Sequence, residues 1–356
     1  MTTPEDESRP MQATGRSVTA EAVEWGFRLL AGRDALTRAE FASFKAMPDL
    51  DAMRRAFTNL PEFHGFFTTV LTGYPAYTAP LFLLRPPAAP EDLPWRFEPP
   101  TLDRLVSQLC TAAQFDEPAF REIIQALGLR TGRTRALWEQ AWIVSVLATD
   151  GLIAPGKSGV GFDAGRDRIA SLLAARGVSV LGTGGTVADD KEAEARRLQM
   201  FHPEAVHIED FDRLVSFLEL DARHLRRMPP ASHDFCWSIG VPSRLGSIEA
   251  ALDFLEASLV ALKPGGLAVH TFGFNLTSDS ATWELPDLVL LRRRDIEALA
   301  EKLAPAGHRI VTLNTHPGSD LADETVKTEA HGPIGHRQRH GFAVATSFGL
   351  AIRKAA

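Results

Sequence analysis

Residues 157–184, KSGVGFDAGRDRIASLLAARGVSVLGTG, predict a strand, a glycine turn, a helix and a second strand in close succession. An apolar strand around Val160 leads into a turn that contains Gly161, Asp163 and Gly165, and apolar residues then recur on one face of the helix. This order is half of a nucleotide-binding βαβ unit, in which the turn and the helix N-terminus hold a polar ligand. A glycine turn also occurs in α/β proteins without such a ligand, so the stretch alone leaves both interpretations open.

The composition excludes several classes of protein. The 356 residues favour two domains, and 45% of them are hydrophobic, enough for a full core. A net charge of −7 argues against a nucleic-acid partner, which usually requires a basic surface, and fits small or neutral substrates better. Cys110 and Cys236 share no metal-ligand spacing, so we expect a reducing, cytoplasmic setting and no metal site. No apolar run of about 18 residues and no signal peptide is seen, so no membrane association is expected.

The N-terminal part is predicted to be helical after a short tail. Residues 1–17 have the composition of a disordered tail, and residues 18–74 contain three amphipathic segments that begin at Thr19, at Thr37 and near Pro48. The order WGFRLLAGRD, a short helix and LDAMRRAFTNLPEF resembles the small helical domain DUF4214, found beside glycosyltransferases and methyltransferases in bacterial proteins. The resemblance implies a non-catalytic module that could bind a protein partner. Ordinary helices of one larger domain are the alternative.

Eight prolines in residues 75–100 predict an irregular linker, since proline removes backbone donors and disfavours helix before it. An α/β domain is expected over 101–356, opening with helical segments at 102–113, 118–127 and 134–150. The tryptophans and aliphatic residues of the last segment are interpreted as core. Further strands are predicted at LVSFLEL, DFCWSIGV, LAVHTF, RIVTL and FAVATSFGLAI. Together these give a mostly parallel sheet of seven strands with one antiparallel strand at its end.

Segments between Ser107 and Lys354 resemble bacterial class I S-adenosylmethionine-dependent methyltransferases. The most specific are LKPGG before a strand and the helix RRRDIEALAEKLAPAGH. The others are SQLCTAAQF, RALWEQAWIVSVLATDGLIAPGKSGVGF, HDFCWSIG, RLGSIEAALDFLEASLVA and VATSFGLAIRK. The resemblance implies a Rossmann-like sheet of order 3-2-1-4-5-7-6, with S-adenosylmethionine across the carboxyl ends of strands 1, 2 and 4. It also implies methyl transfer to a small molecule or a sugar, so that the partner is a small-molecule or glycan substrate.

The resemblance further implies site residues. The glycine turn would face the methionine part of the cofactor, Asp221 would accept a hydrogen bond from the adenine amine, and His270 is the remaining candidate for a proton acceptor. The cofactor-binding positions carried over are Gly161, Asp163, Gly165, Gly184, Asp221, Ser238 and Ile239. For Asp221 the alternative is a solvated carboxylate at a strand end. For His270 the alternative is a buried, hydrogen-bonded core histidine.

Several positions depart from the pattern of the family. Asp163 stands where a glycine is usual, Gly184 where an acid usually binds the ribose, Ser243 and Arg244 where relatives have Glu-His, and Gly273 where they have Glu. Asp163 could bind the cofactor's ammonium group or repel its carboxylate. Because these changes lie at the cofactor and substrate edge, the alternative to an enzyme is a degenerate binding or scaffold protein in a glycan-modifying assembly.

Three histidines near the C-terminus, His331, His336 and His340, lie in the segment HGPIGHRQRH. Their setting is rich in glycine and arginine. We therefore expect a loop over the active-site face and no metal site.

Overall fold

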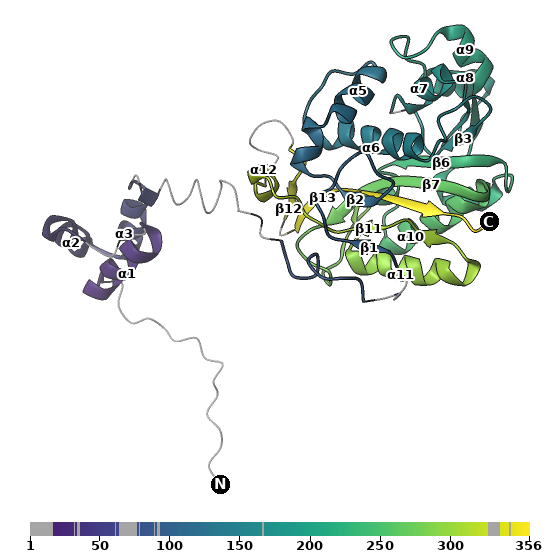
Figure 1. Ribbon diagram of the computed structural model, residues 1–356. Coiled ribbons are helices and arrows are strands. Elements are labelled where there is room, and N and C mark those ends of the chain that lie inside the picture. Colours follow the sequence, from purple (N-terminus) through teal and green to yellow (C-terminus); the bar gives the residue numbers. More distant parts are fainter. Residues whose placement is uncertain are drawn as a thin grey trace. The chain divides into compact units, whose positions relative to one another are not determined.

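The computed structural model divides the chain into two compact units, Met1–Pro75 and Ala76–Ala356. The residues that it describes are 17–31, 33, 36–60, 62–63, 77, 79–88, 90, 93–165, 167–326, 335–341 and 343–356. The predicted tail, apart from Ser17, lies outside these residues. Figure 1 shows the helices of the first unit and the sheet of the second, which are described separately.

Among the described residues, the first unit contains the short helices α1 Ala20–Leu30, α2 Arg38–Lys45 and α3 Leu50–Phe57. Each begins at a polar side chain that accepts a hydrogen bond from a backbone amide of the first turn, as N-cap residues do. The capping residues are Thr19, Thr37 and Asp49. The helix starts that the sequence predicted at Thr19 and Thr37 are therefore stabilised by contacts within each helix and do not depend on packing between the helices.

Three phenylalanines form the core of this unit. Phe27, Phe44 and Phe57 come from different helices, and their ring centroids lie 4.8 to 4.9 Å apart. Gly26 allows the close approach, because a Cβ atom there would lie 2.6 Å from the ring of Phe57. The unit thus has a small core of its own, while its resemblance to DUF4214 stays a prediction.

The second unit is built on one sheet with the order β1-β11-β2-β13-β7-β6-β3-β4-β5. β5, β4, β3, β6 and β7 pair in parallel, and β13 is antiparallel to β7. The strands are β1 Trp95–Arg96, β2 Ser107–Leu109, β3 Ser158–Gly161, β4 Ser179–Gly184, β5 Val215–Glu219, β6 His233–Ile239, β7 Leu262–Asn275, β10 Arg309–Ile310, β11 Leu313–Asn314, β12 Gln338–His340 and β13 Ala343–Arg353. A separate hairpin is formed by β8 Trp283–Leu285 and β9 Leu288–Leu290.

The predicted count of seven strands is wrong, because the sheet described has eleven. The additional strands are two or three residues long, and three of them, β2, β11 and β1, extend the sheet beyond β13. β10 pairs with the last residues of β13, and β2 pairs with its middle, so both lie along the same edge of that strand. Residues 102–113 were predicted to be helical, but pairing with β13 and β11 places β2 there. The Ser107 hydroxyl reinforces this edge by donating to the Val311 carbonyl at 2.8 Å.

The proline-rich segment, which we predicted to be an irregular linker, belongs from Ala76 onward to the second unit. Tyr77, Leu83 and Leu93 are buried in the core of the second unit, and the Tyr77 hydroxyl donates to the Leu276 carbonyl at 3.0 Å. Trp95–Arg96 forms an edge strand of the sheet. The prolines prevent helix but leave the chain free to lie extended over the domain. The α/β unit therefore begins about 25 residues before the predicted start at residue 101.

Helices cover both faces of the sheet, giving three layers (Figure 1). α10 and α11 supply apolar side chains to one core and α6, α7 and α9 to the other. The helices are α5 Pro118–Ala126, α6 Arg135–Thr149, α7 Ile169–Ala175, α8 Asp190–Leu198, α9 Ile208–Leu214, α10 Ile248–Ala257, α11 Arg293–Leu303 and α12 Leu321–Glu324, with 3-10 turns η2 Ala112–Asp116, η3 Ala222–Arg227, η4 Pro242–Arg244, η5 Ser258–Ala261 and η6 Ala304–Ala306. No helix in the described part of the chain is long and apolar enough to cross a membrane.

The aromatic residues of α6 pack in the core of the second unit. Trp138 and Trp142 are fully buried and stack with ring centroids 6.0 Å apart. Gly349 of β13 makes room for this pair, since a Cβ atom there would lie 2.4 Å from the Trp142 ring. The prediction that this stripe is core is confirmed.

Candidate cofactor site

A cavity of about 210 Å³ lies at the carboxyl ends of the parallel strands. Asp163 comes from the turn after β3, Gly184 from the end of β4, Asp221 from the end of β5, and Val241 and Arg244 from the segment after β6. The carboxyl edge of a parallel sheet is where ligands of open α/β folds bind. The structure therefore brings together three of the predicted cofactor-binding residues, Asp163, Gly184 and Asp221.

The turn after β3 has the backbone conformation that glycine usually supplies. Asp163 has a φ of 52° and Gly165 a φ of 121°. Aspartate is among the few residues that adopt the left-handed region at modest cost. Asp163 thus keeps the turn while adding a carboxylate to the cavity. Gly161 has another role, since a Cβ atom there would lie 2.5 Å from the Trp237 ring.

An ion pair in the wall of the cavity joins the turn after β3 to η4. Arg244 Nη2 donates to Asp163 Oδ2 at 2.7 Å, and Arg244 Nη1 donates to the Ile239 carbonyl at 3.2 Å. Both charged side chains are partly exposed, 34% for the arginine and 43% for the aspartate. Two residues that the sequence marked only as separate departures therefore contact each other directly.

Asp221 already has a structural partner. Its Oδ1 accepts a hydrogen bond from the Arg223 amide at 2.7 Å and so caps η3, while Arg223 Nη1 lies 3.7 Å from Oδ2. The Leu220 amide donates to the Gly184 carbonyl at 2.7 Å, which joins the ends of β5 and β4. Asp221 is 41% exposed, so its second oxygen stays accessible to a ligand.

Gly184 lies in regular strand, without a positive φ. A Cβ atom there would lie 3.3 Å from the ring of Phe217, a tight contact with a half-buried side chain. The backbone would therefore accept another residue, and only the Phe217 ring would have to shift by a few tenths of an ångström.

His270 and Ser238 lie in the core and do not line the cavity. His270 Nδ1 is 2.8 Å from Ser238 Oγ, and Nε2 is 3.0 Å from Ser258 Oγ. Burial lowers the pKa of His270 to about 3, because the charged imidazolium would lose its hydration. His270 is thus a neutral core histidine, as the alternative interpretation expected, and it cannot accept a proton from a substrate in this cavity.

Two further predicted positions also lie outside the lining. Ile239 contributes its backbone carbonyl to Arg244, and Gly165 shapes the turn after β3 through its positive φ. Both act through the backbone. Sequence patterns cannot distinguish such support from direct contact with a ligand.

Asp167 is a buried acid that the sequence analysis missed. Its Oδ1 accepts a hydrogen bond from the Ile169 amide at 2.9 Å at the start of α7. Burial raises the pKa of Asp167 to about 6, and the nearby Asp163 charge adds to the rise. A signal was present, because aspartate commonly accepts a hydrogen bond from the backbone amide two residues ahead, as in an Asx turn.

A second cavity, of about 420 Å³, lies between η2, α12 and the segment before β12. Asp323 is buried beside it and accepts hydrogen bonds from the Ala112 amide and from His336 Nε2, both at 2.9 Å. Burial favours the neutral acid, but these hydrogen bonds outweigh it and hold the pKa of Asp323 below its usual range. His336 is therefore committed to Asp323, and His331 of the same predicted group lies outside the described residues.

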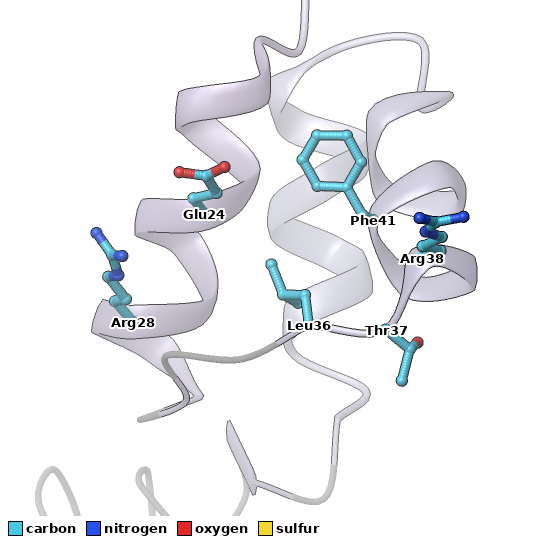
Figure 2. A pocket seen from close by; sticks show the side chains of 6 residues that line it. All are labelled: Glu24, Arg28, Leu36, Thr37, Arg38 and Phe41. Atoms are coloured by element: carbon cyan, nitrogen blue, oxygen red, sulfur yellow. The ribbon is translucent and has the colours of Figure 1, made fainter.

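The helical unit has a cavity of its own, of about 400 Å³. Figure 2 shows its lining, with Glu24 and Arg28 on α1, Phe41 on α2 and Leu36 in the segment before α2. Four of the six lining residues are polar or charged.

No protein-family model matches the sequence, and no curated protein matches it. Among solved structures, the chain is similar to a provisionally assigned sarcosine dimethylglycine methyltransferase from Galdieria sulphuraria, with 15% identity and a TM-score of 0.41 over 67% of this chain and 99% of that one. A Burkholderia thailandensis 1,6-didemethyltoxoflavin-N1-methyltransferase, solved with S-adenosylhomocysteine, has 16% identity and a TM-score of 0.37 over 68% and 81%. A SAM-dependent methyltransferase from Aquifex aeolicus has 14% identity and a TM-score of 0.34 over 68% and 96%. Methyltransferases are thus among the structures similar to this chain, at identities and TM-scores too low to carry an argument about its activity.

Proposed function

We propose that this protein binds S-adenosylmethionine and transfers its methyl group to a small-molecule or sugar acceptor. The observation that carries the proposal is the cavity at the carboxyl ends of the parallel strands, lined by Asp163, Gly184 and Asp221. The strand order supports it. Seven of the eleven described strands can be taken in the order β5-β4-β3-β6-β7-β13-β10, which is compatible with the order 3-2-1-4-5-7-6 that the resemblance implied.

The lining suits this cofactor chemically. Leu220, Val241 and Leu245 offer apolar contacts to an adenine ring, and the accessible oxygen of Asp221 can accept a hydrogen bond from its amine. The volume of about 210 Å³ is below the roughly 300 Å³ at which ligand pockets commonly begin. Because the partly exposed Arg244 side chain forms one wall, its rotation would enlarge the cavity.

Methyl transfer places few demands on the protein. The sulfonium supplies the activated methyl group, and the protein mainly positions the acceptor in line with it. The buried His270 is therefore not needed, and an acceptor with a readily ionised group would react without a base. The 420 Å³ cavity opens at the same edge of the sheet, since Ala112 follows β2, which runs parallel to β7. We propose it as the region through which the acceptor enters.

A second candidate is a binding or scaffold protein without catalysis. The Asp163–Arg244 ion pair favours it, because the pair fills space that a cofactor would need. Titration of the full chain with S-adenosylmethionine and S-adenosylhomocysteine by calorimetry separates the candidates. Saturable binding of both supports the enzyme, and absence of heat for both at millimolar concentration supports the scaffold.

Other parts of the proposal rest on the sequence. The acidic composition and the cysteine pattern favour a cytoplasmic protein without nucleic-acid or membrane partners. A protein partner is proposed for the helical unit, and a glycan is one of the acceptors to be tested. Co-purification of tagged residues 18–74 from the native host would test the protein partner.

A further inference from the structure

We infer that Asp163 and Arg244 form a clamp for the amino-acid end of the ligand, and we call this pair the amino-acid clamp. The inference rests on the proposed function, since it concerns the same cavity. An amino acid carries an ammonium group and a carboxylate on one carbon atom. Asp163 matches the first and Arg244 the second, so a zwitterion can replace the internal ion pair with two complementary ones.

The geometry allows the ion pair to open, so that each side chain can bind a charged group of the ligand instead. One hydrogen bond of 2.7 Å joins the two side chains, and they belong to separate loops, the turn after β3 and η4 after β6. The pair is partly exposed, with 34% of the arginine and 43% of the aspartate side chain accessible. Exposed ion pairs contribute little to stability, typically about 0 to 1 kcal/mol, so opening this pair costs little.

The backbone holds both charges in place. Asp163 keeps a φ of 52°, and Gly240 a φ of 62°, while the Gly240 amide donates to the Thr271 carbonyl at 2.9 Å. A Cβ atom at Gly240 would lie 3.0 Å from Arg244 Nη1, so glycine there makes room for the guanidinium. Ser243 Oγ accepts a hydrogen bond from the Gly273 amide at 2.7 Å and anchors η4 to β7. Gly240 and Ser243 therefore fix the position of Arg244.

Arg244 also offsets the repulsion that Asp163 alone would exert on the carboxylate of the ligand. A lone carboxylate would attract the ammonium group of the ligand and repel its carboxylate. With the guanidinium beside it, the carboxylate of the ligand gains a charge-assisted hydrogen bond, which a planar guanidinium forms well. The clamp thus selects ligands with an intact amino-acid end over those without one.

The test compares two ligands that differ only in this end. S-adenosylhomocysteine carries the amino acid, and 5′-methylthioadenosine replaces it with a methyl group. We expect wild-type protein to bind the first more tightly. Arg244→Ala should weaken S-adenosylhomocysteine by about ten-fold to a hundred-fold, the effect of one charge-assisted hydrogen bond, and leave 5′-methylthioadenosine unchanged or tighter. Asp163→Asn, which tolerates the same φ, should act in the same direction.

Arg213→Ala is the matched control, because Arg213 forms a similar pair with Asp210 on the surface of α9, at 2.6 Å. It should change neither affinity. Arg244→Gln serves as a second variant if the alanine variant has a lowered thermal transition.

Each outcome decides between hypotheses. If the Arg244 and Asp163 variants bind both ligands more weakly, or both more tightly, to the same extent, the pair only limits the size of the cavity. The clamp would then be wrong, while the cofactor site would stand. Equal affinity of wild-type protein for both ligands would overturn the clamp in the same way. Failure of wild-type protein to bind either ligand would overturn the proposed function and the clamp together.

Discussion

Ser243 Oγ accepts a hydrogen bond from the Gly273 amide at 2.7 Å, so two residues that both differ from the methyltransferases that the sequence resembles contact each other. The next residue, Arg244, contacts a third departure, Asp163, also at 2.7 Å. Four of the five changed positions, all but Gly184, therefore form two contacting pairs. This arrangement is more consistent with a remodelled site than with scattered losses, because the new side chains of Asp163, Ser243 and Arg244 each contact another changed position.

The Ser243 contact explains why residue 273 has to be small. A Cβ atom at Gly273 would lie 2.9 Å from Leu290 Cδ2 and 3.3 Å from Ser243 Oγ. We therefore expect Gly273→Ala to lower the free energy of unfolding by about 1 to 3 kcal/mol, the usual cost of overpacking a buried site. Urea unfolding measures it. Gly185→Ala is the control, since no atom lies within 4 Å of its Cβ position and its effect should stay below about 0.5 kcal/mol. Equal stability of the two variants would contradict this packing argument.

Gly184→Asp should tighten binding of S-adenosylmethionine. A carboxylate at this position could accept hydrogen bonds from the ribose hydroxyls, an effect of about 1.5 to 3 kcal/mol, or roughly ten-fold to a hundred-fold in affinity. The backbone does not oppose the change, because Gly184 has no positive φ. Gly184→Ala carries the same contact with Phe217 without the carboxylate, so it is the reference in the calorimetric comparison. Identical affinities for the two variants would mean that the ribose lies elsewhere.

Asp221→Ala should weaken both cofactor binding and the local fold. Asp221 caps η3 through the Arg223 amide, and loss of a cap costs about 0.5 to 2 kcal/mol. Asp221→Asn keeps an acceptor for the cap and removes the charge. We expect a lower melting temperature for the alanine variant only, and weaker S-adenosylmethionine binding for both. Should the asparagine variant bind like wild-type protein, the charge of Asp221 would have no role in the cofactor site.

The boundary of the α/β unit determines which fragments of the chain we expect to fold stably. A fragment of residues 76–356 should unfold cooperatively, whereas 101–356 should aggregate or melt at a lower temperature. The shorter fragment lacks Tyr77, Leu83 and Leu93, which are buried in the core, and burying one leucine contributes about 1.5 to 3 kcal/mol. Calorimetric melting of both fragments checks this. Equal melting temperatures would show that the segment only rests on the surface.

The sequence predicted the long elements of the fold and missed the short ones, for physical reasons. Residues 157–184 carry apolar positions at helical and strand spacing, and the structure has β3, α7 and β4 there. β1 and β11 have two residues each, too few to show any alternation, and are defined by pairing with distant strands. The prolines of residues 75–100 excluded helix but gave no sign that the chain packs on the domain.

The candidate site was predictable only where a residue follows a strand. Gly184 ends its strand, Asp163 and Asp221 lie two residues after theirs, and all three meet at one edge of the sheet, as the topology requires. The contact between Asp163 and Arg244 joins residues 81 positions apart, and only the folded chain reveals it. β7 is buried on both faces near His270, so alternation could not tell whether this side chain faces the core or the site.

His270 provides a pH test of its interpretation as a core residue. Its pKa falls from an ordinary value of 6.5 to about 3 in the folded protein, because burial disfavours the imidazolium. Above pH 6.5 the imidazole is neutral in both states, and its full contribution to stability is present. As the pH falls below 6.5 the unfolded chain binds a proton that the folded protein does not, so stability decreases by about 1.4 kcal/mol per pH unit until about pH 3.

Urea unfolding of wild-type protein and His270→Gln between pH 7 and pH 4.5 measures this decrease, since glutamine can hydrogen-bond to Ser238 and Ser258 but does not titrate. We expect the stability of the wild-type protein to fall more than that of the variant, by about 2.7 kcal/mol at pH 4.5. His224→Gln, which replaces an exposed histidine, is the control for the substitution itself. If the curves of wild-type protein and His270→Gln are parallel, His270 titrates alike in both states. It would then be open to protons, and its role as a proton acceptor would again have to be considered.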